Sequence, residues 1–188
     1  MSSLHKRVLL ITCGPGVGKI TVLLKTTDIL KAKGLTVGGI LSREVRSNRT
    51  RIGFEVTDLY TGETGWLAHT NLKYGPRVGK CHMNFADLDG VGTDAVRKTN
   101  KGCDIVAIDE AGPMELFSEK SKHVVRVAVD NRKPVIAIIH WRTEDQFVKE
   151  IKTREDAEIF VVTSENKDSF PSAIASKAAE YLAATRLE

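Results

Sequence analysis

A glycine-rich segment near the N-terminus contains the residue types that bind phosphate groups. The segment reads Cys13-Gly14-Pro15-Gly16-Val17-Gly18-Lys19-Ile20-Thr21. It lies between an apolar run at residues 8–11 and an amphipathic stretch at residues 19–33, which is the strand-to-helix context that a phosphate loop requires. Small residues let backbone N–H groups point at an anion, and the start of a helix adds partial positive charge. We therefore expect residues 13–21 to bind nucleotide phosphates and the Lys19 ammonium to contact the β- and γ-phosphates.

This segment departs from the Walker A pattern GxxxxGK[ST] at two positions. Cys13 stands where the pattern has Gly, and its small side chain fits if its backbone φ is not positive. Ile20 stands where the pattern has Ser or Thr, so the hydroxyl that normally binds Mg²⁺ is missing. Thr21 does not replace that hydroxyl, because one helical residue rotates a side chain by about 100°, and we expect it to contact the α-phosphate. A glycine-rich turn without a ligand is the alternative, which the strand-to-helix context disfavours.

Two adjacent carboxylates follow a second apolar run. Residues 105–108 are apolar, and Asp109 and Glu110 come next, as in a Walker B element. Carboxylates at the carboxyl end of a parallel strand face the crevice where α/β sheets bind ligands. We expect Asp109 to hold Mg²⁺, directly or through water, and Glu110 to polarise the water that attacks the γ-phosphate. The alternative is that the two acids only cap the following segment, and the upstream phosphate loop makes that interpretation weaker.

Strand-like and helix-like patterns alternate along the chain. Apolar runs, which are typical of strands buried on both faces, predict strands at residues 8–11, 35–41, 105–108, 134–139 and 159–162. Amphipathic patterns predict helices at residues 19–33, 87–100, 117–131, 143–154 and 169–183. Strands at 51–59, 66–68 and 80–85 would form a small antiparallel β insert, at roughly residues 43–86. The order predicts an α/β fold, a three-layer P-loop sandwich (RecA-like or nucleotide-kinase-like) with a mostly parallel sheet, in a single domain spanning residues 1–188.

Composition narrows the class of protein. The chain has 188 residues, of which 41% are hydrophobic and 28% charged, and its net charge is +4. The charges are interleaved with no run of five like charges, so nucleic acid is an unlikely main partner, and a mildly positive protein suits triphosphate anions. The three cysteines form no CxxC pair, which disfavours a disulfide framework or a zinc site. No apolar stretch is long enough for a signal peptide or a membrane span, so we expect a cytoplasmic monomer.

Further polar residues follow two of the predicted strands. Arg43, Arg46, Arg49 and Arg51 follow residues 35–41, and either one of them reaches the triphosphate or all belong to a solvated hairpin. His140 and Trp141 follow residues 134–139 and could contact the γ-phosphate or a base, although packing at a strand end is favoured. Ser118 is a candidate N-cap for the helix that follows it.

Together, several motifs resemble one family of enzymes. The motifs are Gly16-Val17-Gly18-Lys19, Arg43-Glu44-Val45-Arg46, Arg51-Ile52-Gly53-Phe54, Asp109-Glu110-Ala111-Gly112-Pro113-Met114-Glu115-Leu116-Phe117-Ser118 and Val161-Val162-Thr163-Ser164-Glu165-Asn166. Over nearly the whole chain they resemble the thermophilic-type nucleoside-triphosphatases, a family that includes the cancer-related nucleoside-triphosphatase. The resemblance implies a P-loop fold and hydrolysis of ATP, GTP and other nucleoside triphosphates to diphosphates. It also implies that Lys19 binds phosphate, that Asp109 serves Mg²⁺, and that Glu110 is the catalytic carboxylate.

The chain differs from the family pattern at several positions. The family usually has Gly, Thr and Ile where Cys13, Ile20 and Ala111 stand, and it often has Lys at Pro113 and Thr at Ile138. The changes at Ile20 and Ile138 remove hydroxyls near the expected γ-phosphate and Mg²⁺. Two alternatives to an active triphosphatase follow. One is a nucleotide-binding protein with little or no turnover, and the other is a kinase for a small acceptor, which the fold would permit.

Overall fold

One mixed β-sheet organises the part of the chain that the computed structural model describes, residues 6–14, 16–109, 118–140, 142 and 144–186. Across these residues the sheet has nine strands in the order β5-β6-β4-β3-β2-β7-β8-β1-β9. The strands are β1 (Val8–Thr12), β2 (Val37–Ser47), β3 (Thr50–Asp58), β4 (Thr64–His69), β5 (Arg77–Val78), β6 (Cys81–Met83), β7 (Ile105–Asp109), β8 (Val135–Ile138) and β9 (Ala157–Val161). The five strands β2, β7, β8, β1 and β9 pair in parallel. This confirms the predicted α/β class with its parallel core.

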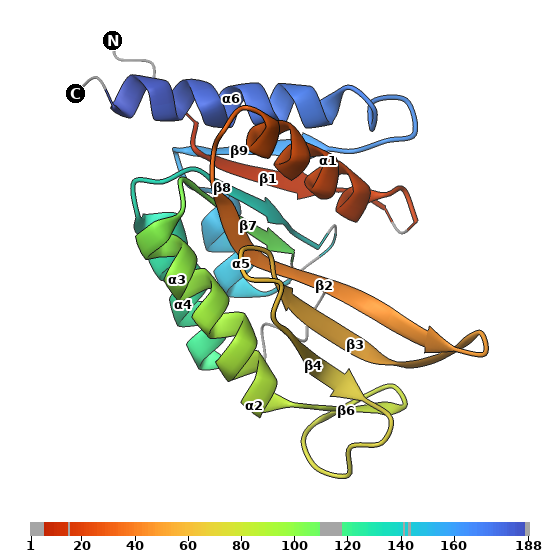
Figure 1. Cartoon of the computed structure of the whole chain (residues 1–188). Coiled ribbons are helices and arrows are strands. Elements are labelled where there is room, and N and C mark those ends of the chain that lie inside the picture. The colour runs from red at the N-terminus through yellow and green to blue at the C-terminus, as the bar shows by residue number, and fades with distance from the viewer. Residues whose placement is uncertain (1–5, 15, 110–117, 141, 143, 187–188) are drawn as a thin grey trace.

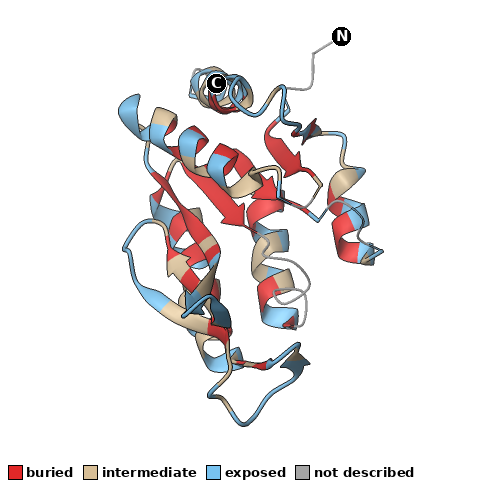
Figure 2. Ribbon diagram, turned by 90° about the vertical axis from the view of Figure 1, so that its right-hand side faces the viewer, coloured by how far each residue is buried: buried red, intermediate tan, exposed pale blue. Residues whose placement is uncertain are grey.

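Helices cover both faces of the parallel strands (Figure 1). The helices are α1 (Lys19–Ala32), α2 (Phe85–Asp87), α3 (Thr93–Gly102), α4 (Glu119–Asp130), α5 (Gln146–Lys152) and α6 (Phe170–Thr185). On β1, the side chains of Leu9 and Ile11 join a core with α1 and α6, while those of Val8 and Leu10 join a core with α3, α4 and α5. The central strands β1, β7 and β8 are therefore buried on both sides (Figure 2), which explains why their sequences are apolar runs. The edge strand β9 is partly exposed, at Ile159 and Val161 among other residues.

The antiparallel insert is a continuation of this sheet. The second predicted strand, residues 35–41, is longer in the structure, because β2 runs on to Ser47 and pairs with β3 from Ile40 to Ser47. Strands β4, β6 and β5 then extend the sheet outward through antiparallel pairs. Figure 1 shows β2 leaving the parallel core and becoming one arm of the β2–β3 hairpin. One strand therefore belongs to both parts of the sheet.

The helical segment after the insert differs from the expectation in two ways. The strand predicted at residues 80–85 ends at Met83, because the side chain of Asn84 accepts hydrogen bonds from the N–H groups of Ala86 and Asp87 and starts a helix. The helix predicted at residues 87–100 begins with α2, and a π-helical segment, Leu88–Gly92, joins α2 to α3. Helix α4 begins as predicted, since the Ser118 hydroxyl accepts a hydrogen bond from the Ser121 N–H. Helix α5 is shorter than the predicted 143–154, because Asp145 caps its start.

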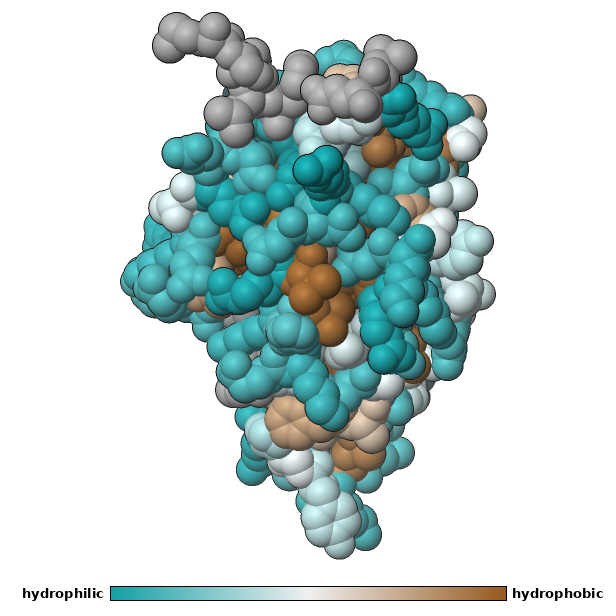
Figure 3. Space-filling model, turned by 90° about the vertical axis from the view of Figure 1, so that its left-hand side faces the viewer, coloured by the Kyte–Doolittle hydropathy of each residue, from teal (hydrophilic) through white to brown (hydrophobic). Residues whose placement is uncertain are grey.

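The surface of the described residues carries only scattered apolar side chains. Its most exposed large apolar side chains belong to Tyr60, Tyr74, Phe85, Val127, Ile159 and Val161. Figure 3 shows one face that is mostly hydrophilic, with apolar residues in small separate patches. Within the described segments, no helix is both long and apolar enough to span a membrane.

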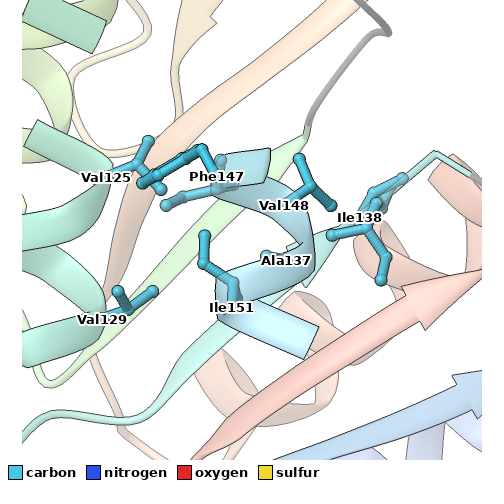
Figure 4. A pocket seen from close by; sticks show the side chains of 9 residues that line it. Val125, Val129, Ala137, Ile138, Phe147, Val148 and Ile151 are labelled. Atoms are coloured by element: carbon cyan, nitrogen blue, oxygen red, sulfur yellow. The ribbon is translucent and has the colours of Figure 1, made fainter. Parts of the chain in front are cut away.

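A small apolar cavity lies between α4, α5 and the sheet (Figure 4). Its volume is about 40 Å³, and Val125, Val129, Phe147 and Ile151 are among its lining residues. The change Val125→Ile adds one methylene group beside this space, and we expect it to raise the free energy of unfolding by about 0.5–1 kcal/mol. Urea denaturation measures this change. Val127→Ile on the exposed side of α4 is the control. If Val125→Ile alone lowered the free energy of unfolding, the cavity would have no room for the added methylene group.

Candidate active site

The phosphate-loop segment joins β1 to α1 as predicted. Helix α1 begins at Lys19, and Gly18 caps it with a left-handed backbone, φ +108°. Gly16 also has a positive φ of +77°. A Cβ atom at Gly16 would meet nothing within 4 Å, so the backbone angle, and not crowding, requires glycine there. The first-turn N–H groups of a helix have no partner within the helix, so the start of α1 beside this loop is a place where an anion can bind.

We expect Gly18→Ala to weaken both folding and phosphate binding. An L-residue at φ +108° is strained, and the strain should cost about 1–3 kcal/mol of stability or force the loop to change shape. Nucleotide affinity should fall about tenfold or more, as measured by titration calorimetry. Gly14→Ala is the matched control for stability, because Gly14 has no positive φ and a Cβ there meets no atom within 4 Å. Equal stability of the two variants would contradict the backbone argument.

The two unusual residues of the loop are accommodated in different ways. Cys13 is buried in the core between the sheet and α1, and among the described residues other than glycine only Asn48 and Arg49 have positive φ. The condition set for Cys13 is therefore met. Ile20 packs against the same core, so its alkyl side chain replaces a hydroxyl with an apolar contact. Thr21 is exposed and lines a pocket beside the loop with Val17 and Lys25. Its expected contact with the α-phosphate stays a prediction.

Asp109 is a carboxylate that is fully buried and has a raised pKa. It ends β7 and has no exposed surface. One carboxylate oxygen, Oδ2, accepts a hydrogen bond from the Ser42 backbone N–H at 3.2 Å. The other, Oδ1, is buried and has no hydrogen-bond partner among the described residues. Burial raises the pKa of Asp109 to about 6, and the Ser42 N–H and the positive charge of Lys19 oppose the rise.

The strand order explains why these groups meet. Asp109 aligns with Ile138 at the carboxyl end of β8, and β8 lies between β7 and β1. Strand β1 ends at Thr12, whose buried hydroxyl oxygen also has no hydrogen-bond partner in the described part of the chain. The loop and Lys19 follow directly. The carboxyl edge of the parallel strands thus collects two unpartnered oxygens and one ammonium group, at the edge where open α/β sheets bind ligands.

The donor set at this edge fits a hard divalent cation held jointly with a nucleotide. Mg²⁺ prefers oxygen ligands and is usually bound by one or two carboxylates together with phosphates and water. Asp109 Oδ1 is an oxygen of that kind with an unused acceptor position. In the described residues, no group of three or more His, Cys, Asp or Glu residues could hold a metal ion by itself. The site therefore suits a cation that arrives with the triphosphate, and Ile20 leaves it one ligand short of the usual loop.

Some predicted site residues are not located by the structure, and others have alternative partners. Pro15, Glu110 and Trp141 lie outside the described residues. Arg43 pairs with Glu55 at 2.8 Å, and Arg46 and Arg51 both pair with Glu44, which is the arrangement expected of a charged, solvated hairpin. The His140 ring nitrogen Nδ1 accepts a hydrogen bond from the Arg142 N–H at 3.3 Å.

Comparison with known proteins identifies the family. The sequence model of a family described as NTPase matches residues 8–175. The chain belongs to this family. Nucleoside-triphosphatase THEP1 of Thermofilum pendens is 39% identical over 93% of this chain and 96% of its own length. The protein of the same name from Thermotoga maritima is 39% identical over 86% of this chain and 89% of its own length.

Solved structures of NTPase family members have the same fold. The solution structure of a human cancer-related nucleoside triphosphatase superposes with a TM-score of 0.77 at 31% identity, over 90% of this chain and 96% of that one. The crystal structure of THEP1 from Aquifex aeolicus gives 0.76 at 29% identity, over 90% and 98%. The resemblance inferred from the motifs is confirmed, and with it the P-loop type of fold and the enzyme class, a nucleoside-triphosphatase. NTPases generally use a divalent metal.

Sequence reasoning missed two groups at this edge of the sheet. Thr12 immediately precedes the glycine-rich segment, and its position as the polar end of an apolar strand was a usable signal. The Ser42 backbone N–H could not be found in this way, because it reaches Asp109 only through the pairing of β2 with β7, 67 residues apart.

Proposed function

We propose that this chain hydrolyses ATP, GTP and other nucleoside triphosphates to diphosphate and phosphate, with Mg²⁺ bound at Asp109. The main support for this proposal is Oδ1 of Asp109, which is buried, has no hydrogen-bond partner among the described residues, and lies within the electrostatic influence of Lys19 beside a phosphate loop. Burying an unpaired carboxylate lowers the stability of the fold. Such a carboxylate is expected where a bound cation pairs with its charge.

Each residue of the proposed active site has a distinct role in hydrolysis. The glycine-rich loop and the start of α1 bind the phosphates through backbone N–H groups. Lys19 neutralises charge on the β- and γ-phosphates, and Asp109 would hold the Mg²⁺, which withdraws charge from the transferring phosphoryl group when bound. Glu110, which directly follows Asp109 in the sequence, is proposed to orient and polarise the attacking water.

Phosphate release from ATP and GTP, with and without Mg²⁺, tests the function. We expect Mg²⁺-dependent release that falls by about 100-fold or more in Lys19→Ala. Lys31→Ala in the last turn of the same helix is the control. Glu110→Gln tests the assigned base, since release that persists in this variant would overturn its role while leaving the function in place. Absence of release from any nucleotide would overturn the function itself.

The packing of Ile20 supports a second candidate, a nucleotide-binding protein with little turnover. Ile20 contributes an apolar contact to the core at the position of the usual Mg²⁺-binding hydroxyl. In that case nucleotides bind with ordinary affinity but phosphate release stays near background.

The proposal also covers domain organisation, cellular location and oligomeric state. We propose that the chain acts as a single-domain cytoplasmic monomer and does not depend on nucleic acid. The continuous sheet that joins the insert to the parallel core supports one domain, and the interleaved charges of the sequence disfavour a polyanion partner. Size-exclusion chromatography with light scattering checks the oligomeric state.

A further inference from the structure

Arg43 lies on the face of the sheet that α1 covers. Side chains alternate between the two faces of a strand. On β2, Leu41 packs with the core under α1 and α6, whereas Ser42 lies opposite Val56, which belongs to the core on the other face. Arg43 therefore shares the face of Leu41, and its side chain starts on the same side of the sheet as the phosphate loop.

Two charged groups of the proposed active site lie on this side as well. On β7, Ile105 and Ala107 belong to the core under α1 and α6, and Asp109 follows them in the same alternation. Burial raises the pKa of Asp109, and the positive charge of Lys19 at the start of α1 opposes the rise, so these two groups interact. Arg43 adds a second cation to this side of the sheet.

Arg43 is also close to the end of β7. Strand β2 pairs with β7 as far as Ile40 opposite Ile108 and then continues beyond it (Figure 1). The Ser42 N–H donates to Oδ2 of Asp109 at 3.2 Å, and Arg43 is the next residue. Strand spacing and rise per residue place the Cα atoms of Arg43 and Asp109 about 8 Å apart. A side chain as long as that of arginine can therefore reach a phosphate bound beside Asp109.

Glu55 holds the guanidinium of Arg43 along one edge. Glu55 lies directly opposite Arg43 on β3, and its Oε1 is 2.8 Å from both Nε and Nη2 of Arg43. The Glu55 side chain is 16% exposed, and that of Arg43 is 64% exposed. Because a guanidinium has five N–H donors, Nη1 and one N–H of Nη2 have no partner among the described residues. These donors remain accessible to an anionic ligand.

We propose that Arg43 is a further catalytic residue, which contacts the γ-phosphate of the bound triphosphate, and that Glu55 is the positioning residue that orients it. The proposal rests on the proposed function, because the phosphates must occupy the adjacent loop. Glu55 binds one edge of the guanidinium, and the other edge donates to two γ-phosphate oxygens, a geometry that a planar guanidinium allows and an ammonium does not.

This contact would stabilise the transition state of hydrolysis. Water forms the new P–O bond as the bond to the nucleoside diphosphate breaks, and the transferred phosphoryl group carries negative charge over its three equatorial oxygens. Arg43 stays protonated throughout and neutralises part of that charge. Its contribution matters more in this chain than in a usual phosphate loop, because Ile20 provides no hydroxyl ligand for the cation.

Titrations of the complete chain with ADP and with the non-hydrolysable β,γ-imido analogue of ATP test the contact without hydrolysis. In Arg43→Ala we expect the affinity for the ATP analogue to fall about tenfold, while the affinity for ADP stays within about twofold. Phosphate release at saturating ATP should fall about 10- to 100-fold. Arg43→Lys keeps the charge without the planar fork, so its losses should be intermediate.

Arg46→Ala is the matched control. Arg46 belongs to the same hairpin but pairs with Glu44, as Arg51 does. Glu44 lies opposite Phe54, which packs against the core on the other face of the sheet. This variant removes one positive charge from the hairpin without touching Arg43, so both affinities and phosphate release should stay unchanged. Losses equal to those of Arg43→Ala would mean that net charge acts, and would overturn the contact.

Glu55→Ala tests the positioning role. We expect a smaller loss of affinity for the ATP analogue than in Arg43→Ala. In a chain that already carries Arg43→Ala, the change should have no further effect on the ratio of analogue to ADP affinity, because Glu55 then has nothing to orient. A structural role of Glu55 would persist without Arg43, so a further loss in the double variant would overturn the positioning role.

The outcomes separate this inference from the proposed function. If Arg43→Ala lowers the affinities for ADP and the analogue equally, or changes neither, the γ-phosphate contact is overturned whatever the rate of hydrolysis. If the unmodified chain releases no phosphate but its affinity for the analogue depends on Arg43, the contact is supported and the hydrolytic function fails. If the unmodified chain binds neither ligand, both proposals fail. Thermal unfolding checks that each variant is folded.

Discussion

Asp109→Asn is expected to abolish most metal-dependent hydrolysis and at the same time to stabilise the metal-free protein. Phosphate release should fall by about 100-fold or more, because the neutral amide no longer binds the cation. The pKa of Asp109 is about 6, against 3.8 for an ordinary Asp, and this difference corresponds to about 3 kcal/mol of lost stability at neutral pH. The buried amide N–H₂ group lacks an assigned acceptor and offsets part of the gain, so a net increase of about 1–2 kcal/mol is expected.

The same shift predicts how pH acts on this group. The folded-state pKa of Asp109 is raised, so the folded protein binds the proton more tightly than the unfolded chain does. The contribution of Asp109 to stability is therefore greatest below pH 3.8 and is lost as pH rises through about 6. The affinity for Mg²⁺ changes in the opposite direction, because the proton must leave before the cation binds, and it should fall as pH drops through about 6. Thermal unfolding and Mg²⁺ titration across this range measure the two trends.

Asp104 at the other end of β7 provides the control. Its carboxylate accepts hydrogen bonds from the N–H and hydroxyl of Thr36, both at 2.8 Å, and these contacts, with the Arg186 guanidinium, hold its pKa below the usual value. Asp104→Asn should therefore lower stability at neutral pH and leave hydrolysis unchanged. If Asp109→Asn also lowered stability, the account of an unfavourably buried charge would be wrong.

Ile20→Thr is expected to raise Mg²⁺-dependent turnover by about tenfold to 100-fold, because it restores a hydroxyl ligand beside the phosphates. Ile20 packs against the core, and the smaller side chain should cost about 1 kcal/mol of stability. Phosphate release under saturating nucleotide and Mg²⁺ measures the gain, and denaturation measures the cost.

Ile20→Val separates the hydroxyl from the change in size. Valine has the shape of threonine without its oxygen, so this variant should have the stability loss without the gain in turnover. If all three proteins turn over at similar rates, the cation is held without a loop hydroxyl and the chain is a competent triphosphatase as it stands. If only Ile20→Thr turns over, the chain is a nucleotide-binding member of the family.

Local patterns predicted the elements that carry the site. The phosphate loop, the start of α1 at Lys19 and the buried strand ending at Asp109 all depend on residues close together in the sequence, and the structure has each of them. The continuation of β2 to Ser47 was not predicted, because residues 43–47 contain two arginines and a glutamate, and only their pairing with β3 makes them a strand. The π-helical segment Leu88–Gly92 lies within the helix predicted at residues 87–100, and the apolar pattern of so few residues does not distinguish a π-helical turn from an α-helical one.

The contacts that set the pKa and the surroundings of the site residues form between residues far apart in the sequence. The pKa of Asp109 depends on its burial and on the Ser42 N–H, and both follow from the order of the strands. Lys25 and Asp168 are 143 residues apart in the sequence and form one wall of the pocket beside the loop. Periodicity reports which side of an element is apolar, but it does not report which polar atoms from other elements will be opposite a given carboxylate. The role expected of a residue could therefore be inferred from the sequence, but the polar and charged groups around that residue could not.

The length of β2 gives the molecule a mechanical connection between its surface and its catalytic edge. The strand runs from Val37 to Ser47 with an irregularity in its pairing between Val45 and Arg46, so one continuous strand joins the exposed tip of the hairpin to the backbone N–H of Ser42, which donates to Asp109. A force or a binding partner that tilts the hairpin would move that donor relative to the carboxylate. Because a carboxylate that loses a hydrogen bond in a buried site becomes a stronger base, bending at the surface would retune the proton and cation affinity of the centre without any contact to the nucleotide.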